Sequence, residues 1–133
     1  MDLSFRLQKS PALVYDYLSD MQKFVSVHPI IYKVEPIEEN QYLIYERLKL
    51  MFIPASFTYK VFVESNLANK TVNYKARINA LTKVELHFRI TEEGSGCIVN
   101  ETVNFKSYLP VRPLIKGIFK EQHKLLFQNI DKL

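Results

Sequence analysis

The order of strand-like and helix-like patterns along the chain constrains its fold more than any other feature. A strand pattern at residues 2–8 precedes a proline-led helical stretch, six strand patterns over residues 30–107 with no helix between them, and one closing amphipathic helix. Short turns make consecutive strands antiparallel neighbours, so we expect an α+β fold with one curved seven-stranded sheet around the closing helix. A hollow between sheet and helix is where we expect a binding function.

The length of 133 residues indicates a single domain over 1–133. Asp2 and Arg6 interrupt the apolar residues at the start of the chain, which predicts neither a signal peptide nor a membrane anchor. The apolar run at 50–55 is far too short to span a bilayer. The single cysteine, Cys97, rules out an internal disulfide, so we expect a cytoplasmic protein.

Strict alternation of apolar and polar residues predicts the strands after the helical stretch. Short segments rich in turn-forming residues, such as 38–40 and 93–96, separate them and favour a meander. The predicted strands are 30–37, 41–50, 56–65, 70–77, 81–91 and 97–107.

Two short helices are predicted between the first and second strands. Ser10 and Pro11 supply an N-cap and a proline at the first helical position. Ser19 and Asp20 interrupt the helical spacing before a second short turn, and the pair at 28–29, His-Pro, ends that turn because the residue before proline disfavours the helical region.

The closing helix is predicted to be amphipathic and basic. Residues 106–133 hold six basic and two acidic side chains, whereas the rest of the chain is balanced, so the net charge of +4 belongs to this segment. Lys116, Lys120 and Lys124 form a stripe that either faces solvent or meets anionic lipid headgroups. Gly117 is either neutral on the polar side or marks a kink beside a ligand. The opposite stripe consists of Val111, Ile115, Ile118, Phe119, Gln122, Leu126 and Ile130.

Two carboxylates fall in apolar rows of the predicted strands. Strand alternation places Glu46 inside with Ile44 and Leu48, and Glu101 inside with Val99 and Val103. Burial disfavours a charged carboxylate, so such a group needs a donor or takes up a proton. Either these residues are polar handles in an apolar pocket, or a bulge shifts the register, or each pairs with a tyrosine or arginine near the rim.

The remaining candidate site residues are aromatic or histidine side chains. Tyr32, Tyr59 and Tyr74 are the preferred cavity tyrosines because a buried hydroxyl needs a partner. His123 flanks the apolar stripe of the closing helix, where it either touches a ligand or reaches solvent. The histidine spacing predicts no metal site, and three glycines without a phosphate-loop pattern predict no nucleotide cofactor. Basic residues interleaved with stacking aromatics are also missing, so we expect no nucleic-acid partner.

The segment at 9–20, KSPALVYDYLSD, followed by Lys23-Phe24 and His28-Pro29, resembles the START-like helix-grip superfamily. That group includes polyketide cyclases and aromatases, pollen-allergen-type proteins and lipid-transfer domains. The resemblance extends over the whole order of elements, including the Gly94–Gly96 hairpin. It implies a seven-stranded antiparallel sheet gripping the C-terminal helix, with a cavity for an apolar or aromatic small molecule, and it carries over no catalytic residues.

Three functions therefore remain open. The first is binding or transport of a small hydrophobic ligand, with the apolar turn at 51–54 as the mouth of the cavity. The second is a cyclase or dehydratase in which Glu46 or Glu101 is the general base. The third is an interaction module that docks on a protein or membrane surface through its basic helix. The expected ligand-binding residues are Tyr32, Glu46, Tyr59, Tyr74, Leu86, Phe88, Glu101, Phe119, His123 and Leu126.

Overall fold

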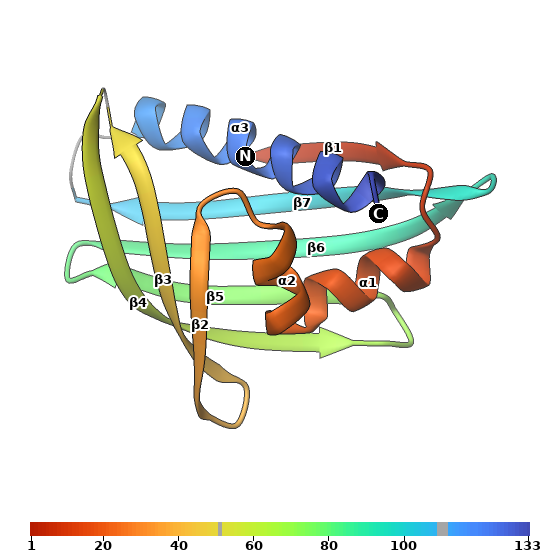
Figure 1. Ribbon diagram of the computed structural model, residues 1–133, viewed down its shortest axis with the longest axis horizontal. Coiled ribbons are helices and arrows are strands. Elements are labelled where there is room, and N and C mark those ends of the chain that lie inside the picture. The colour runs from red at the N-terminus through yellow and green to blue at the C-terminus, as the bar shows by residue number, and fades with distance from the viewer. Residues whose placement is uncertain (51, 109–111) are drawn as a thin grey trace.

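The computed structural model describes residues 1–50, 52–108 and 112–133, and it has the α+β architecture predicted from the sequence (Figure 1). One curved sheet carries all three helices on its concave side, with α3 lying across β7 and β1 and the α1–α2 pair below it in the view of Figure 1. The elements in chain order are β1 (Asp2–Leu7), α1 (Pro11–Ser19), α2 (Met21–Val27), β2 (Ile31–Glu38), β3 (Gln41–Leu50), β4 (Ile53–Asn66), β5 (Thr71–Asn79), β6 (Thr82–Glu93), β7 (Gly96–Ser107) and α3 (Arg112–Asp131).

The seven strands form a single antiparallel sheet in the order β1-β7-β6-β5-β4-β3-β2. Strands β2 to β7 are a meander, as their short turns predict, and β1 joins the far edge of β7. The strands β2, β3 and β4 curve across the front of the molecule while β5, β6 and β7 run along its length (Figure 1). The sheet therefore curves around the helices on its concave side (Figure 1).

Side-chain caps determine where the two short helices begin and end. The Ser10 side chain accepts a hydrogen bond from the Leu13 amide at the start of α1. Asp20 separates the helices, because its carboxylate accepts hydrogen bonds from the amides of Gln22 and Lys23 and so caps α2. His28 is the C-cap of α2. The predicted start at Ser10 and Pro11, the break at 19–20 and the end at His28 are all confirmed.

The hairpin between β3 and β4 is longer than predicted. Strand β4 begins at Ile53 rather than at residue 56, and Pro54 pairs with Lys49 within the ladder. Pro54 is tolerated because β5 pairs with β4 only from Lys60 onward, so this end of β4 has a free edge. Phe52, at a positive φ of 75°, is 95% exposed at the tip. Met51 lies outside the described residues.

Alternation correctly predicted which faces of β4 to β7 are buried. Val61 and Val63 are buried while Lys60 and Glu64 are exposed, and the same pattern holds on β5, β6 and β7. The register between β3 and β4 is continuous, so no bulge moves Glu46 to the other face.

The interior is solid at one end only. Val14 and Leu18 of α1 belong to the same buried core as Leu126, Phe127 and Ile130 of α3, and none of these side chains is more than 3% exposed. No described helix is long and apolar enough to cross a membrane. The predicted stripe residue Val111 lies outside the described residues.

Candidate functional site

A cavity of about 310 Å³ lies between the N-terminal half of α3 and the concave face of β3–β6, with α2 closing one side. Most of its walls are apolar. The lining side chains include His28, Glu46, Tyr59, Phe119 and His123. An unfilled interior of this kind is what the wrapped sheet was predicted to leave.

Six of the ten predicted site residues line this cavity. They come from four different strands and from α3, so residues that are far apart in the sequence meet in the folded protein. These residues are Glu46, Tyr59, Tyr74, Leu86, Phe119 and His123. The hydroxyl of Tyr74 donates a hydrogen bond to the carbonyl oxygen of Leu18, so this tyrosine offers the cavity its ring and not its hydroxyl.

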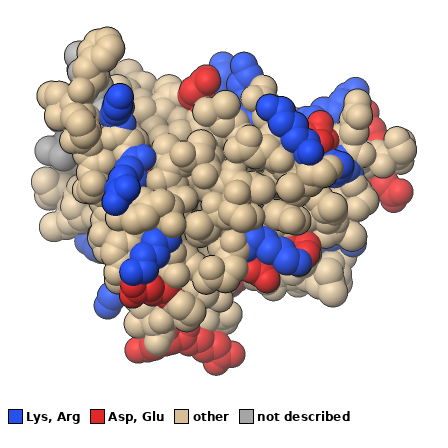
Figure 2. All heavy atoms as spheres, viewed as in Figure 1, with Lys and Arg blue, Asp and Glu red and all other residues tan. Residues whose placement is uncertain are grey.

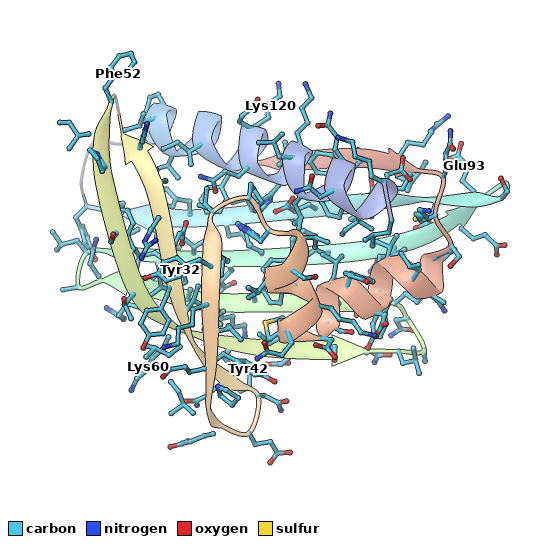
Figure 3. All side chains as sticks on the ribbon, in the orientation of Figure 1. Tyr32, Tyr42, Phe52, Lys60, Glu93 and Lys120 are labelled. Carbon is cyan, nitrogen blue, oxygen red and sulfur yellow. The ribbon has the colours of Figure 1, made fainter. Side chains whose placement is uncertain are left out.

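The prediction that Tyr32 faces the cavity is wrong. Tyr32 is 45% exposed on the outer face of β2, where the Arg47 guanidinium lies 4.1 Å from the centre of its ring (Figure 3). The cause is a bulge between Ile31 and Lys33, which leaves Tyr32 and Lys33 both exposed and gives the inward position to Ile31.

Three further predicted residues lie in the solid interior behind the cavity wall. Phe88 and Leu126 are 1% and 0% exposed and pack where the C-terminal half of α3 meets the sheet. The sequence pattern assigned Phe88 and Leu126 to the inner side correctly. It could not predict how far the cavity extends along α3. Glu101 is also absent from the wall, and its carboxylate contacts the wall residue His123.

Glu46 and Tyr59 face each other across β3 and β4. The Tyr59 hydroxyl donates a hydrogen bond of 2.6 Å to Oε2 of Glu46, which is the tyrosine pairing that the sequence left open. Burial raises the pKa of the Glu46 carboxyl, and the Tyr59 hydrogen bond and a positive charge on His123 partly oppose this effect. The pKa of Tyr59 is raised well above its ordinary value, first by burial and then by Glu46. The pair therefore holds a carboxyl group that protonates readily inside an apolar wall.

Glu101 and His123 form a buried pair between β7 and α3. Nδ1 of His123 lies 2.7 Å from Oε1 of Glu101 and makes a hydrogen bond there. The same nitrogen is 2.6 Å from Oε2, which has no hydrogen bond among the described residues. Side-chain exposure is 4% for the histidine and 0% for the glutamate. The partner of Glu101 is thus a histidine and not the tyrosine or arginine considered from the sequence.

His28 is a cavity residue that sequence analysis missed. The pattern identified it only as the end of a helix, and that role is correct. Its Nδ1 also accepts hydrogen bonds from the amides of Ile30 and Ile31, at 3.2 and 3.1 Å, which orients the ring against the cavity. Burial, followed by a positive charge on His123, lowers the pKa of His28 to about 3. A histidine beside a proline carries no sequence signal for such a position.

A second hollow of about 520 Å³ lies on the other side of the same helix, between α3 and the end of β7. Phe105, Ile115 and Phe119 line both spaces and so form the partition between them. Lys83 and Lys106 belong to the second hollow only, which makes it the more polar of the two.

The surface around α3 is basic, and the β3–β4 tip is apolar. Lys116, Lys120 and Lys124 are exposed, and Lys120 points away from the sheet (Figures 2 and 3). Phe52 and Ile53 are 95% and 68% exposed at the hairpin tip that was predicted to form the mouth. Among the residues with a described placement, no cluster of histidine, cysteine and carboxylate side chains could hold a metal ion.

No protein-family model and no curated protein matches the sequence. Solved structures do match it over nearly its whole length. A START superfamily protein from Mycobacterium smegmatis aligns with 99% of this chain and 94% of its own, at 15% identity and a TM-score of 0.74. The Zhui aromatase/cyclase from Streptomyces sp. R1128 aligns with 98% of this chain and 89% of its own, at 9% identity and a TM-score of 0.75. Ara h 8.0201 aligns with 99% of this chain and 94% of its own, at 15% identity and a TM-score of 0.77.

The chain therefore has the helix-grip fold, as the resemblance at 9–29 implied. The identities are low, so the likeness concerns the architecture. What the cavity does has to be argued from its own residues.

Proposed function

We propose that this protein binds a small, uncharged hydrophobic or aromatic molecule in the cavity between its sheet and α3. The observation that carries this proposal is the cavity of about 310 Å³ with largely apolar walls and a few polar groups. Its size is at the lower end of the range of about 300–1,000 Å³ that is typical of ligand pockets. The ligand is therefore small.

The polar groups of the wall indicate what kind of ligand fits. Within the described residues, neither lysine nor arginine lines the cavity, and the Glu46 carboxyl does. A fatty acid or another anion would lose its hydration without gaining a cation, which costs several kcal/mol, of the order of the penalty for one buried ion. A neutral molecule with one carbonyl or hydroxyl group can bond to Tyr59, His28 or His123 and bury the rest of its surface.

The names of the structural neighbours agree with this class of function. One is a START superfamily protein and another an aromatase/cyclase, so binding of an apolar or polyketide-like molecule is consistent with the architecture. Native mass spectrometry of the protein purified from its own host tests the proposal directly. We expect a co-purifying neutral molecule that is lost on denaturation. Repeated recovery of ligand-free protein that also binds no neutral aromatic probe would contradict it.

A further inference from the structure

We propose that the cavity is also a site of proton transfer, in which Nε2 of His123 removes a proton from a carbon next to a ligand carbonyl while Nε2–H of His28 bonds to the carbonyl oxygen. This inference rests on the proposed function, because a ligand must first occupy the cavity. It assigns the base to the histidine and leaves to Glu101 the role of a positioning residue.

The Glu101 contact determines which nitrogen of His123 is free. A carboxylate accepts hydrogen bonds, so Nδ1, at 2.7 Å from Oε1, must carry the proton. In the neutral ring the lone pair is then on Nε2, at the opposite edge. Phe88 and Phe119 hold the ring from two sides, with ring centres 6.0 and 5.4 Å from its own. His123 is therefore an oriented base on the cavity wall.

The backbone determines the opposite arrangement for His28. Two amide N–H groups, of Ile30 and Ile31, donate to Nδ1, so this nitrogen carries no proton and the neutral ring is protonated at Nε2. The pKa of about 3 means that His28 does not become charged at neutral pH. The cavity thus contains one histidine that can accept a proton and one that can only donate a hydrogen bond.

The two rings and Glu46 are close enough for their charges to interact. A positive charge on His123 lowers the pKa of both His28 and Glu46, and all three residues line the same cavity. A carbonyl ligand between them meets a donor at its oxygen and a base near its neighbouring carbon. This is the pairing that enolisation requires.

The proposed step is balanced in atoms and electrons. The C–H bond next to the carbonyl breaks, its proton goes to Nε2 of His123, and its electron pair moves into the enolate, whose oxygen accepts the hydrogen bond from His28. Return of a proton from Nε2 to the carbon regenerates the ketone. Glu101 stabilises the imidazolium that exists between the two transfers. The Glu101 carboxylate is fully buried, so its negative charge is held beside the ring on which the positive charge develops.

The first experiment measures the two tautomers without any ligand. Nitrogen-15 spectra of the histidine rings at mildly alkaline pH should show the proton of His123 on Nδ1 and that of His28 on Nε2. The reverse tautomer at either ring would overturn the proposal. Glu101→Gln removes the negative charge, so we expect a mixture of His123 tautomers. If Glu101 were only structural, this variant would lose thermal stability while the tautomer in the folded protein stayed unchanged.

The second experiment measures exchange of carbon-bound protons. The probes are the neutral aromatic ketones α-tetralone, 1-indanone and 2-acetylnaphthalene in deuterated water, with binding followed by protein chemical-shift changes and exchange by loss of the α-proton signal. His123→Asn keeps an amide N–H for Glu101 and removes Nε2. We therefore expect the exchange rate to fall by about 100-fold. His28→Asn keeps an acceptor for the two amides and should also slow exchange. His87→Asn, on the outer face of β6, is the control and should not.

The outcomes separate this inference from the proposed function. Binding of a ketone without any catalysed exchange overturns the inference and leaves ligand binding intact. Failure of all three ketones to bind contradicts both. Exchange that is unchanged in a folded His123→Asn variant shows that another group is the base and overturns the assignment. Thermal unfolding of each variant establishes that it is folded.

Discussion

Nδ1 of His123 lies 2.7 Å from Oε1 and 2.6 Å from Oε2 of Glu101, and this pair joins α3 to β7 where both side chains are almost fully buried. Each side chain is the hydrogen-bond partner of the other. Removing one member leaves the other buried without a partner, whereas removing both leaves an apolar contact. The pair should therefore be coupled strongly in stability.

We expect Glu101→Leu and His123→Leu each to lower the free energy of unfolding by about 3–5 kcal/mol, and the double variant to recover much of that loss. Chemical denaturation of the four proteins gives the coupling energy directly. The exposed pair Glu85 and His87, at 3.6 Å, is the matched control, and its loss should cost less than about 1 kcal/mol. Additive losses at Glu101 and His123 would show that the two side chains are not coupled.

Glu46→Gln should stabilise the folded protein increasingly as the pH rises. Burial raises the pKa of Glu46 in the folded state, so the folded protein binds more protons than the unfolded chain between the two pKa values. The contribution of Glu46 to stability therefore falls as the pH rises through that window and stays low above it. Glutamine has no such loss, and its amide oxygen still accepts from Tyr59.

Urea denaturation at several pH values from about 4 to 8 measures this difference. Glu64→Gln, at an exposed position of β4, is the control and should give a flat difference. A Glu46→Gln variant that is less stable than the wild-type protein at neutral pH would mean that the ionised carboxylate is stabilised in place.

Filling the cavity should abolish ligand binding. Ala76 of β5 lines the cavity, so Ala76→Phe places an aromatic ring in the space and should lower the affinity for the uncharged probe N-phenyl-1-naphthylamine at least about tenfold, a loss of about 1.4 kcal/mol. Fluorescence titration measures the affinity. Ala12→Phe, on the exposed side of α1, adds the same ring and should bind normally. Palmitate should compete poorly, and strong competition would contradict the expectation of an uncharged ligand.

Two glycines should respond to alanine in opposite directions. Gly117 is exposed within α3, and a Cβ atom there would touch nothing, so Gly117→Ala should stabilise the protein by up to about 1 kcal/mol. A Cβ atom on Gly96 would overlap the carbonyl oxygen of Leu7, so Gly96→Ala must displace β1 from β7 and should destabilise by about 1–3 kcal/mol. Thermal unfolding measures both. A destabilising Gly117→Ala would favour the kink considered from the sequence.

Most of the fold could be predicted because its signals are local. Side chains alternate along a strand with a period of two, so Glu46 and Glu101 could be assigned to the inner face from their own neighbours alone. Capping by Ser10 and Asp20 could likewise be recognised within one turn of helix. Tyr32 was assigned wrongly because a β-bulge interrupts that period. The residue types at 31–33 give no sequence signal for a bulge.

The order of elements, the inward face of every strand except β2 and most residues near the cavity could be predicted from the sequence, since each of these depends on residues a few positions apart. The contact between His123 and Glu101, the place of His28 on the cavity wall beside His123 and the burial of Phe88 and Leu126 in solid core could be seen only in the folded protein. These facts depend on how far α3 is rotated and shifted against strands that are distant in the chain. That placement results from the packing of all side chains together.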